Sequence, residues 1–473
     1  MMTRYLLCIW FVGSIALTAA GQHSDGAVEF ECNDASLQQG FQWARAQALS
    51  WVRRGHDPVG HWYEASLPGR SAFCMRDVSH QLSGANLLGL ADINKNLLFR
   101  FAASVDSSRD WCGYWEIDKE GGPAPVDYKS DLDFWFNLPG NFDVMNACVR
   151  QYQWSSDTTY LQHPVFQRFY EVVSSDYIKR WDRNGDGIME GTTDTKIPYR
   201  GIGSYEEAKE GLTGCDLIAI QSHALSSLGN LLRDRGDRGR AAALQQQADK
   251  LFHRFQNEWW NDSGKFYYQF LQKDSNRLRN DPMQVMLLRW NFVASSRIKD
   301  VLRSVLESES QMNVETLSYL PRELFRYGSP DEGVRALKKL TSPELKRREY
   351  PEVSFAALEA YCEGLMGIGV HAPDYAVSTL SRLPSDTLRA RLLHIPLFGG
   401  TIDVAHEGQN STTISNHTPQ TITWFAGFHG EGAWLQVAAM RERATATLDL
   451  NGRKVLLVRV KVAPGATVTA KIP

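Results

Sequence analysis

Acidic side chains beside the starts of predicted helices are the most informative chemical feature of this 473-residue sequence. Glu206 and Glu207 follow Tyr205 on a polar loop that leads into a helix, and Glu352 follows Pro351 at the start of a later one. Carboxylates at such edges are rigidly supported and face clefts, where they exchange protons with a substrate. Because adjacent helical residues point in different directions, at most one of Glu206 and Glu207 faces a cleft squarely.

Two such carboxyl groups fit the hydrolysis of a glycosidic bond. That reaction needs one protonated and one ionised carboxyl on opposite sides of the anomeric carbon. Glu206 and Glu352 are the candidate pair, with Glu207 as the alternative to Glu206. The competing interpretation is that all three are ordinary acids at helix N-termini, where the helix dipole favours negative charge.

Two further clusters have side chains suited to sugar hydroxyls. Arg76 and Asp77 precede His80 at the start of a predicted helix, and a guanidinium can fork two hydrogen bonds to a vicinal diol. The alternative is that Asp77 caps the helix, Arg76 pairs with it and His80 is a structural histidine.

The second cluster mixes acids with aromatic residues before another predicted helix. Asp131, Asp133, Trp135 and Asn137 would suit a sugar subsite, with Trp135 stacking on a sugar ring. A helix-capping region with a half-buried aromatic cluster explains the same residues equally well.

The residues Asp182, Asn184, Asp186 and Glu190 match the first part of a calcium-binding loop. The twelfth position of such a loop, which should be a bidentate acid, is Thr193. A tight turn stabilised by Asp, Asn and Gly is therefore the preferred interpretation, and calcium is the alternative. No other cofactor is expected.

Composition excludes several function classes. The net charge of −3 argues against nucleic-acid binding. Serine-hydrolase, nucleotide and zinc motifs are absent from the sequence. The cysteines after residue 20 are too sparse for a disulfide scaffold, although one or two bridges remain possible in an oxidising compartment. The abundance of Trp, 14 residues, suits a large core with a few sugar-stacking platforms.

The N-terminus has the pattern of an export signal over residues 1–20. Arg4 is followed by the apolar run Tyr5–Leu17 and by small residues before Gly21. That run is too short for a good membrane anchor. We therefore expect a secreted or periplasmic protein that acts on a carbohydrate and does not insert into the membrane once the signal is removed. Its oligomeric state is not predictable from the sequence.

Helical periodicity dominates up to about residue 383, and strands follow. Apolar residues recur at helical spacing over 36–52, 77–90, 94–105, 141–154, 163–181, 213–234, 238–260, 281–291, 296–308, 313–327, 330–340, 352–368 and 372–382. Short connections between these segments favour stacked helical hairpins. Two long loops, 55–75 and 108–130, are typical of segments that line a cleft.

The chain after Leu383 reads as a small antiparallel β module. Short strands are expected over 401–404, 421–428, 434–437, 444–450, 455–462 and 467–472, and Asn451-Gly452 is a strong hairpin signal. The predicted domains are thus a helical domain over 21–390 and a β module over 391–473.

With these features in view, the chain resembles the six-hairpin glycosidases. Arg76-Asp77 is similar to a sugar-binding pair of these enzymes. The turn at 182–190, followed by Tyr205-Glu206 and Thr213-Gly214, resembles the general-acid loop of glucosylceramidase-like β-glucosidases. The final β module resembles that of α-L-rhamnosidases. The acid after Tyr205 is Glu rather than the Asp of the glucosylceramidase-like pattern, which indicates a separate branch.

The resemblance implies a mainly α fold, an (α/α)6 barrel followed by a C-terminal β-sandwich, with the active site at one end of the barrel. It implies a glycoside hydrolase that removes terminal sugars, with Glu206 as general acid. We expect Glu352 to be the base and the reaction to invert the anomeric centre. Two alternatives remain: a polysaccharide lyase acting on uronates, for which His80, Tyr199 and Arg200 offer a base and a cation, and a carbohydrate-binding protein without catalysis.

Overall fold

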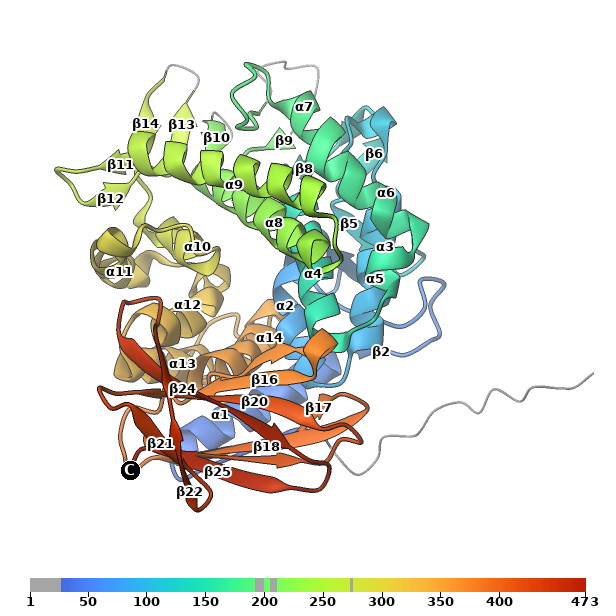
Figure 1. The fold of residues 1–473 in the computed structure, drawn as a ribbon. Helices are drawn as coiled ribbons and strands as arrows, with labels where there is room; N and C mark the ends of the chain where they lie inside the picture. The colour runs from blue at the N-terminus through green and yellow to red at the C-terminus, as the bar shows by residue number, and fades with distance from the viewer. Residues whose placement is uncertain (1–26, 192–199, 205–210, 273–274) are drawn as a thin grey trace, which may run out of the picture.

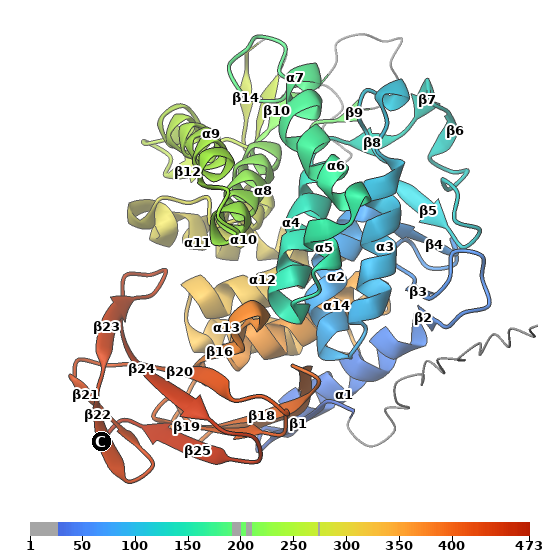
Figure 2. The same ribbon diagram turned by 45° about the vertical axis from the view of Figure 1, so that its right-hand side comes forward.

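The computed structural model describes residues 27–191, 200–204, 211–272 and 275–473. Helices dominate the chain up to about residue 365, and strands dominate the remainder (Figure 1). Figure 2 shows the C-terminal strands packed against one side of the helical part, with helix α1 running beside them. None of the helices in the described ranges is both long and apolar enough to cross a bilayer.

The helical part combines long helices with short ones. The helices in the described ranges are α1 (Ala35–Ser50), α2 (Met75–Leu87), α3 (Ala91–Ser104), α4 (Gly140–Ser155), α5 (Thr159–Gln162), α6 (Pro164–Val172), α7 (Ile178–Trp181), α8 (Cys215–Asp234), α9 (Arg238–Glu258), α10 (Gln284–Arg289), α11 (Ile298–Glu307), α12 (Val314–Tyr327), α13 (Pro330–Leu340) and α14 (Pro351–Glu359).

Six of these described helices pack in a closed ring. Around it, α2 contacts α4, α4 contacts α8, α8 contacts α10, α10 contacts α12, α12 contacts α14, and α14 returns to α2. Outer helices lie against this ring: α1 on α14, α3 on α2 and α4, α9 on α8, α11 on α10, and α13 on α12. Inner and outer helices thus alternate along the chain, as the hairpin pattern of the sequence predicts.

Burial distinguishes the inner helices from the outer ones. Every residue of α2 from Asp77 to Leu87 is buried, because other helices surround it. Helix α9 instead buries mainly one stripe, at Ala241, Leu244, Ala248, Leu251 and Phe255, and leaves its other faces to solvent. The stripe has the spacing of a single helix face.

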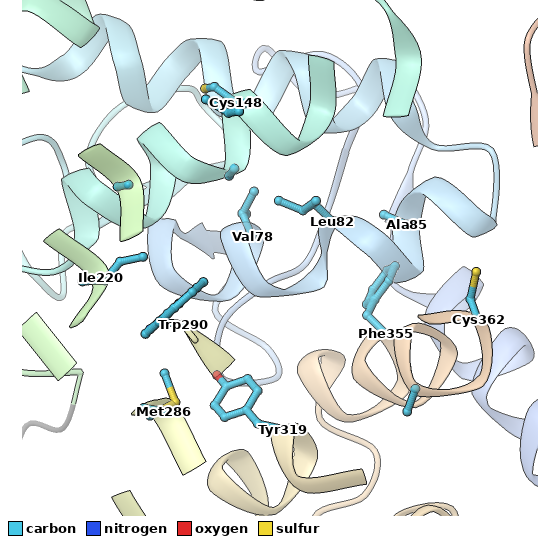
Figure 3. Close-up of a cluster of buried hydrophobic side chains, with 14 of the residues drawn as sticks. Val78, Leu82, Ala85, Cys148, Ile220, Met286, Trp290, Tyr319, Phe355 and Cys362 are labelled. Carbon is cyan, nitrogen blue, oxygen red and sulfur yellow. The ribbon is translucent and has the colours of Figure 1, made fainter. Parts of the chain in front are cut away.

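Apolar side chains from the inner helices meet inside the ring (Figure 3). Val78 and Leu82 of α2 and Trp290, which follows α10, belong to this cluster of buried side chains. Gly84 allows α2 to cross α14 closely, since a Cβ at this position would lie 2.2 Å from the carbonyl oxygen of Phe355. The ring is therefore a packed core rather than an open channel.

Two sheets form the C-terminal β module. The first has the order β1-β17-β18-β19-β25-β21-β22 and the second β15-β16-β20-β24-β23. Their strands are β1 (Glu29–Cys32), β15 (Gly369–His371), β16 (Ala376–Leu380), β17 (Arg389–Leu397), β18 (Gly400–Glu407), β19 (Ser411–Asn416), β20 (Ile422–His429), β21 (Trp434–Val437), β22 (Met440–Arg443), β23 (Thr445–Leu448), β24 (Lys454–Val462) and β25 (Thr467–Lys471). Asn451 and Gly452 turn between β23 and β24, as predicted, with Gly452 at a φ of 73°.

The β module differs from the sequence-based expectation at two places. The segment expected as a helix over 372–382 contains β16, which pairs in parallel with β20. Its Val377, Ser378 and Thr379 suit a strand, and their burial alternates with the pleat. The boundary expected at 390/391 falls inside β17, and the sheet already begins at β15. Helical spacing over so short a segment does not distinguish a helix from a strand.

Strand β1 was not predicted, and it joins the chain's beginning to its end. It pairs antiparallel with β17, from Glu29 opposite Leu393 to Cys32 opposite Ala390. Asn33 adds a side-chain hydrogen bond of 2.9 Å to the Thr387 carbonyl oxygen. Sequence alone could not show this pairing, because the strand is four residues long and its partner lies about 360 residues away.

Short strands also occur in the segments between the helices. They are β2 (Val52–Arg53), β3 (Trp62–Tyr63), β4 (Ala72–Cys74), β5 (Glu116–Asp118), β6 (Tyr128–Ser130), β7 (Asp133–Phe134), β8 (Phe136–Asn137), β9 (Arg200–Gly201), β10 (Gly211–Gly214), β11 (Trp260–Asn261), β12 (Phe266–Tyr267), β13 (Phe270–Gln272) and β14 (Arg277–Leu278). The two loops expected to line a cleft, 55–75 and 108–130, contain β3 to β6 and thus have more structure than predicted.

Candidate active site

A cavity of about 390 Å³ lies where three inner helices begin. Arg76 and Asp77 come from the first turn of α2, Glu315 from that of α12 and Glu352 from that of α14. Acidic residues in the first turn are stabilised by the helix dipole, so the fold itself favours carboxylates at this end of the ring. Three helix starts therefore place their polar side chains around one space.

Arg76 is the centre of the charged groups in this cavity. Its Nε lies 3.3 Å from Oδ1 of Asp77 and 3.1 Å from Oε1 of Glu315. One terminal nitrogen donates to the carbonyl oxygen of Ser204 at 2.6 Å, and the guanidinium lies 5.4 Å from the Trp115 ring centroid. Burial lowers the pKa of Arg76, but Glu315 and Asp77 outweigh it and hold the pKa well above its usual value. Arg76 is thus a fixed cation.

Glu352 has the opposite electrostatic environment. The residue is 7 % exposed, and burial raises its pKa well above the usual value. The negative charges of Asp77 and Glu315 raise it further, whereas Arg76 lowers it. The surroundings of Glu352 therefore favour its protonated form, next to carboxylates that Arg76 keeps paired.

A second wall of the cavity carries Glu116 and Asp127. Glu116 lies on β5, and its Oε1 accepts a hydrogen bond of 2.6 Å from Arg70. Burial and the neighbouring Asp127 raise the pKa of Glu116 to about 7, although Arg70 opposes them. Among the described residues, Oε2 of Glu116 has no hydrogen-bond partner. Glu116 is thus a carboxyl group able to exchange protons near neutral pH.

Aromatic rings complete the cavity. Trp115, Trp135 and Tyr350 line it from three different segments of the chain. Rings of this kind present flat apolar faces on which a sugar ring can stack. The cavity therefore combines a fixed cation, protonated and ionised carboxyl groups, and stacking surfaces.

The structure brings some of the sequence-predicted residues together here and leaves others elsewhere. Arg76, Asp77, Trp135 and Glu352 line the cavity. Tyr205, Glu206 and Glu207 lie outside the described residues, as do Tyr199 and the side chain of Arg200. The roles expected for Glu206 and Glu207 stay predictions. Ser204, the described residue just before them, contacts Arg76.

His80 does not line the cavity. It is 2 % exposed, its Nδ1 lies 2.7 Å from the Tyr319 hydroxyl, and its Nε2 lies 3.5 Å from Asp143. Burial, followed by the charge of Arg289, lowers its pKa well below the usual value. A neutral histidine beneath the cavity is a structural residue, which was the alternative interpretation from the sequence.

The cluster from Asp131 to Asn137 contributes only Trp135. Asp131 lines a separate cavity, where Ser108, Tyr128 and Arg109 bond its carboxylate and lower its pKa to about 2.

The other two members of that cluster also lie apart from the cavity. Asp133 pairs with Lys129 at 3.2 Å, and Asn137 is fully buried. Since β6, β7 and β8 divide this segment into short strands, alternate side chains point to different faces.

The segment from Asp182 to Glu190 forms a tight turn. The Asp182 carboxylate accepts backbone N–H groups of Gly185, Asp186 and Gly187 at 2.8–3.0 Å, and both glycines have positive φ. Arg254 supplies a cation to Asp186 at 2.7 Å.

The rest of this turn uses its side chains in the same way. Asn184 donates to Glu190 at 2.8 Å. No metal-binding group of three or more His, Cys, Asp and Glu side chains occurs within the described ranges. The hydrogen bonds match the turn interpretation.

The cysteines in the described ranges are all free thiols.

The sequence analysis missed several residues of the cavity. Glu315 has the same signal as Glu352, an acid in the first turn of a helix, here after the Asn313 cap. Glu116 and Asp127 lie in the long loop that was expected to line a cleft, but nothing in their spacing distinguishes them from other loop acids. Arg70 and Trp115 also lie in the two loops expected to line a cleft, 55–75 and 108–130, but their residue types did not single them out.

Comparisons with known structures find several proteins of similar fold. The α-L-rhamnosidase from Dictyoglumus thermophilum superposes with a TM-score of 0.60 at 12% identity, covering 94% of this chain and 50% of that one. The α-L-rhamnosidase from Streptomyces avermitilis, complexed with L-rhamnose, superposes with a TM-score of 0.57 at 13% identity. The match covers 95% of this chain and 42% of that one. A putative kojibiose phosphorylase from the human microbiome superposes with a TM-score of 0.57 at 9% identity. The match covers 92% of this chain and 63% of that one.

These similarities concern the fold. The chain spans between 42% and 63% of the lengths of those three proteins. By sequence it matches no family model and no curated protein. The likeness therefore shows that this chain shares its fold with those proteins.

Proposed function

We propose that the protein is a glycosidase whose active site is the cavity around Arg76 and Glu352. The fold shared with rhamnosidases supports a glycoside hydrolase. The helix ring and its outer partners correspond in this proposal to an (α/α)6 barrel, with the β-sandwich packed beside it. The observation that carries the proposal is the convergence of protonated and ionised carboxyl groups in one cavity with aromatic walls.

The surroundings of these carboxyl groups support different roles for them, proton donation for one and activation of water for another. A general acid must hold a proton before the reaction, and the burial of Glu352, which raises its pKa, favours that state. A group that activates water must be ionised, which fits Glu315 and Asp77 beside Arg76. We therefore propose Glu352 as the proton donor, in place of the water-activating role expected from the sequence. Glu206 keeps its predicted role as the competing donor.

The remaining features of the proposal are the mode of attack, the cellular location and the stereochemistry. The cavity lies at the starts of three inner helices, and we propose that the enzyme binds the end of a glycan chain there and releases terminal sugars. The predicted signal at residues 1–20 directs it outside the cytoplasm, and its substrate is a carbohydrate. Inversion of the anomeric centre remains part of the proposal, and it requires the two reacting carboxyls to stand about 6.5–9.5 Å apart.

A panel of aryl glycosides, oligosaccharides and polysaccharides tests this function. We expect the purified protein to release reducing sugar from chain ends of at least one substrate class. Products that absorb ultraviolet light as unsaturated uronates would identify a lyase instead. Binding without any product would identify a carbohydrate-binding protein and would refute the proposal.

A further inference from the structure

Three arginines line the cavity, and two of them are neutralised by carboxylates. Arg76 lies between Asp77 and Glu315, and Arg70 donates to Glu116 at 2.6 Å. These cations hold the protein's own acids in place. They have little capacity left for a negative charge on a ligand, since each already has a partner of opposite sign.

Arg347 is different from the other two. Within the described part of the chain, its guanidinium has no hydrogen bond or ion pair with a carboxylate, although it borders the cavity. The described contact of the guanidinium is with Tyr350, whose ring centroid lies 5.7 Å away. The side chain is exposed, so a ligand in the cavity can reach it.

The backbone fixes Arg347 at this place. Its φ is 63°, in the left-handed region that non-glycine residues seldom adopt. The amide of Tyr350 donates to the carbonyl oxygen of Arg347 at 3.1 Å and closes a turn directly before α14. Glu352 stands in the first turn of that helix. The same turn therefore carries the unpaired cation and leads to the protonated carboxyl.

We propose that the cavity selects a sugar bearing a carboxylate, which Arg347 binds. A guanidinium forms paired hydrogen bonds with a planar carboxylate, and the Tyr350 ring holds it in orientation. Arg76 and Arg70 offset part of the negative charge of the cavity, and the raised pKa values of Glu116 and Glu352 reduce it further. This inference names the substrate class of the proposed glycosidase site and rests on that function.

Arg348 provides a matched control on the same turn. Its guanidinium lies 4.6 Å from the Trp43 ring centroid and donates to the Thr341 carbonyl oxygen at 3.0 Å. It does not border the cavity. Replacing either arginine with Gln removes one positive charge from the same segment, but only Arg347→Gln removes a cation that borders the cavity.

The test measures binding to the full-length chain by calorimetry. The probes are glucuronate, galacturonate, mannuronate and guluronate, each beside its neutral sugar, and inorganic phosphate as a second anion. We expect at least one uronate to bind about tenfold or more tightly than its neutral counterpart, as a charge-assisted hydrogen-bond pair provides. Arg347→Gln should abolish this preference, and Arg348→Gln should keep it.

Three results would overturn the inference. They are the absence of any uronate preference, a preference that survives Arg347→Gln, and competition by phosphate as strong as that by the uronate. None of these three binding results depends on whether the protein hydrolyses a glycoside, which a separate assay measures. A protein that hydrolyses neutral glycosides without uronate preference fails this inference alone, whereas one that binds uronates without cleaving any glycoside fails the proposed function.

Discussion

Among individual residues, the proton affinity of each carboxyl group decides whether it can donate a proton or activate water in the proposed reaction. Burial raises the pKa of Glu352, and its neighbours Asp77 and Glu315 raise it further, which favours the protonated form. Arg76 keeps those two neighbours in ion pairs. The sequence showed the acid at position 352 but not its surroundings. Its role could be inferred only after the helix starts were seen to meet.

The identity of the proton donor can be tested with leaving groups. In Glu352→Gln, we expect kcat for an alkyl glycoside, whose leaving group needs a proton, to fall about 10²–10⁴-fold. The loss for a dinitrophenyl glycoside should be much smaller, because that leaving group departs without a proton. Initial rates on both substrates give the comparison.

The same comparison applied to Glu206→Gln separates the two candidate donors. An equal loss on both glycosides in Glu352→Gln would return Glu352 to the water-activating role expected from the sequence. A selective loss in Glu206→Gln would then identify Glu206 as the donor.

At the scale of elements, buried ion pairs and close helix crossings hold the ring together. Glu359 of α14 lies 3.0 Å from Arg150 of α4, 3.3 Å from Arg289 of α10 and 3.6 Å from Arg322 of α12. One side chain thus connects four inner helices. Breaking such a pair from one side leaves a buried charge without its partner and is strongly destabilising.

Glu359 should make the stability of the protein sensitive to acid. Burial alone raises its pKa, but Arg289, Arg322 and Arg150 outweigh it and bring the pKa to about 2. Because the folded value lies below the unfolded one, its stabilisation is present above about pH 4.5 and is lost as pH falls toward 2. That contribution is on the order of 3 kcal/mol.

Urea unfolding of wild type and Glu359→Gln at several pH values tests this. The difference in unfolding free energy should be large at pH 7 and shrink on acidification. Glu258→Gln is the control, because Glu258 pairs with Arg254 on an exposed helix face. A difference for Glu359→Gln that does not change with pH would contradict the role of these ion pairs.

The crossing of α2 and α14 gives a second prediction at this scale. Gly84→Ala places a methyl group against the Phe355 backbone, so the helices must separate. We expect a loss of about 1–3 kcal/mol, typical of overpacking, measured by thermal unfolding. Gly239→Ala in α9 meets no atom within 4 Å and should be neutral or slightly stabilising. Equal stability of the two variants would show that the crossing is not tight.

Element identity was largely predictable, whereas the meeting of elements was not. The helical stretches and the strands after residue 400 follow from periodicity, which local sequence carries. The pairing of β1 with β17 and the convergence of Glu116 with Glu352 depend on contacts between distant segments. The segment 372–382 has the apolar spacing of a helix but contains strand β16. Its pairing with β20 outweighs the local preference for a helix.

At the scale of the whole molecule, the helical part and the β module share elements. Strand β1 (Glu29–Cys32) precedes the helical part in the sequence, yet it belongs to the C-terminal sheet. His406 of β18 also lies 2.9 Å from the Met366 carbonyl oxygen, next to the end of the helical part. The C-terminal sheet therefore includes a strand from before the helical part, and a histidine of that sheet contacts the end of the helical part.

Calorimetry should therefore show one unfolding transition for both parts. Since β1 and α1 are joined by two residues, unfolding of the sheet releases the start of the helical part as well. We expect a single peak whose calorimetric and van't Hoff enthalpies agree. Two separated peaks would show that the parts are independent domains.

The central claim is that the cavity around Arg76 and Glu352 hydrolyses glycosidic bonds. It is tested most directly by measuring reducing-sugar release from the best substrate by wild type, Glu352→Gln and Glu349→Gln. Glu349 is exposed just before the same helix and serves as the control. We expect wild type and Glu349→Gln to cleave a natural glycan at similar rates, and Glu352→Gln to cleave it at least about 10²-fold more slowly. Full activity in a folded Glu352→Gln would contradict it.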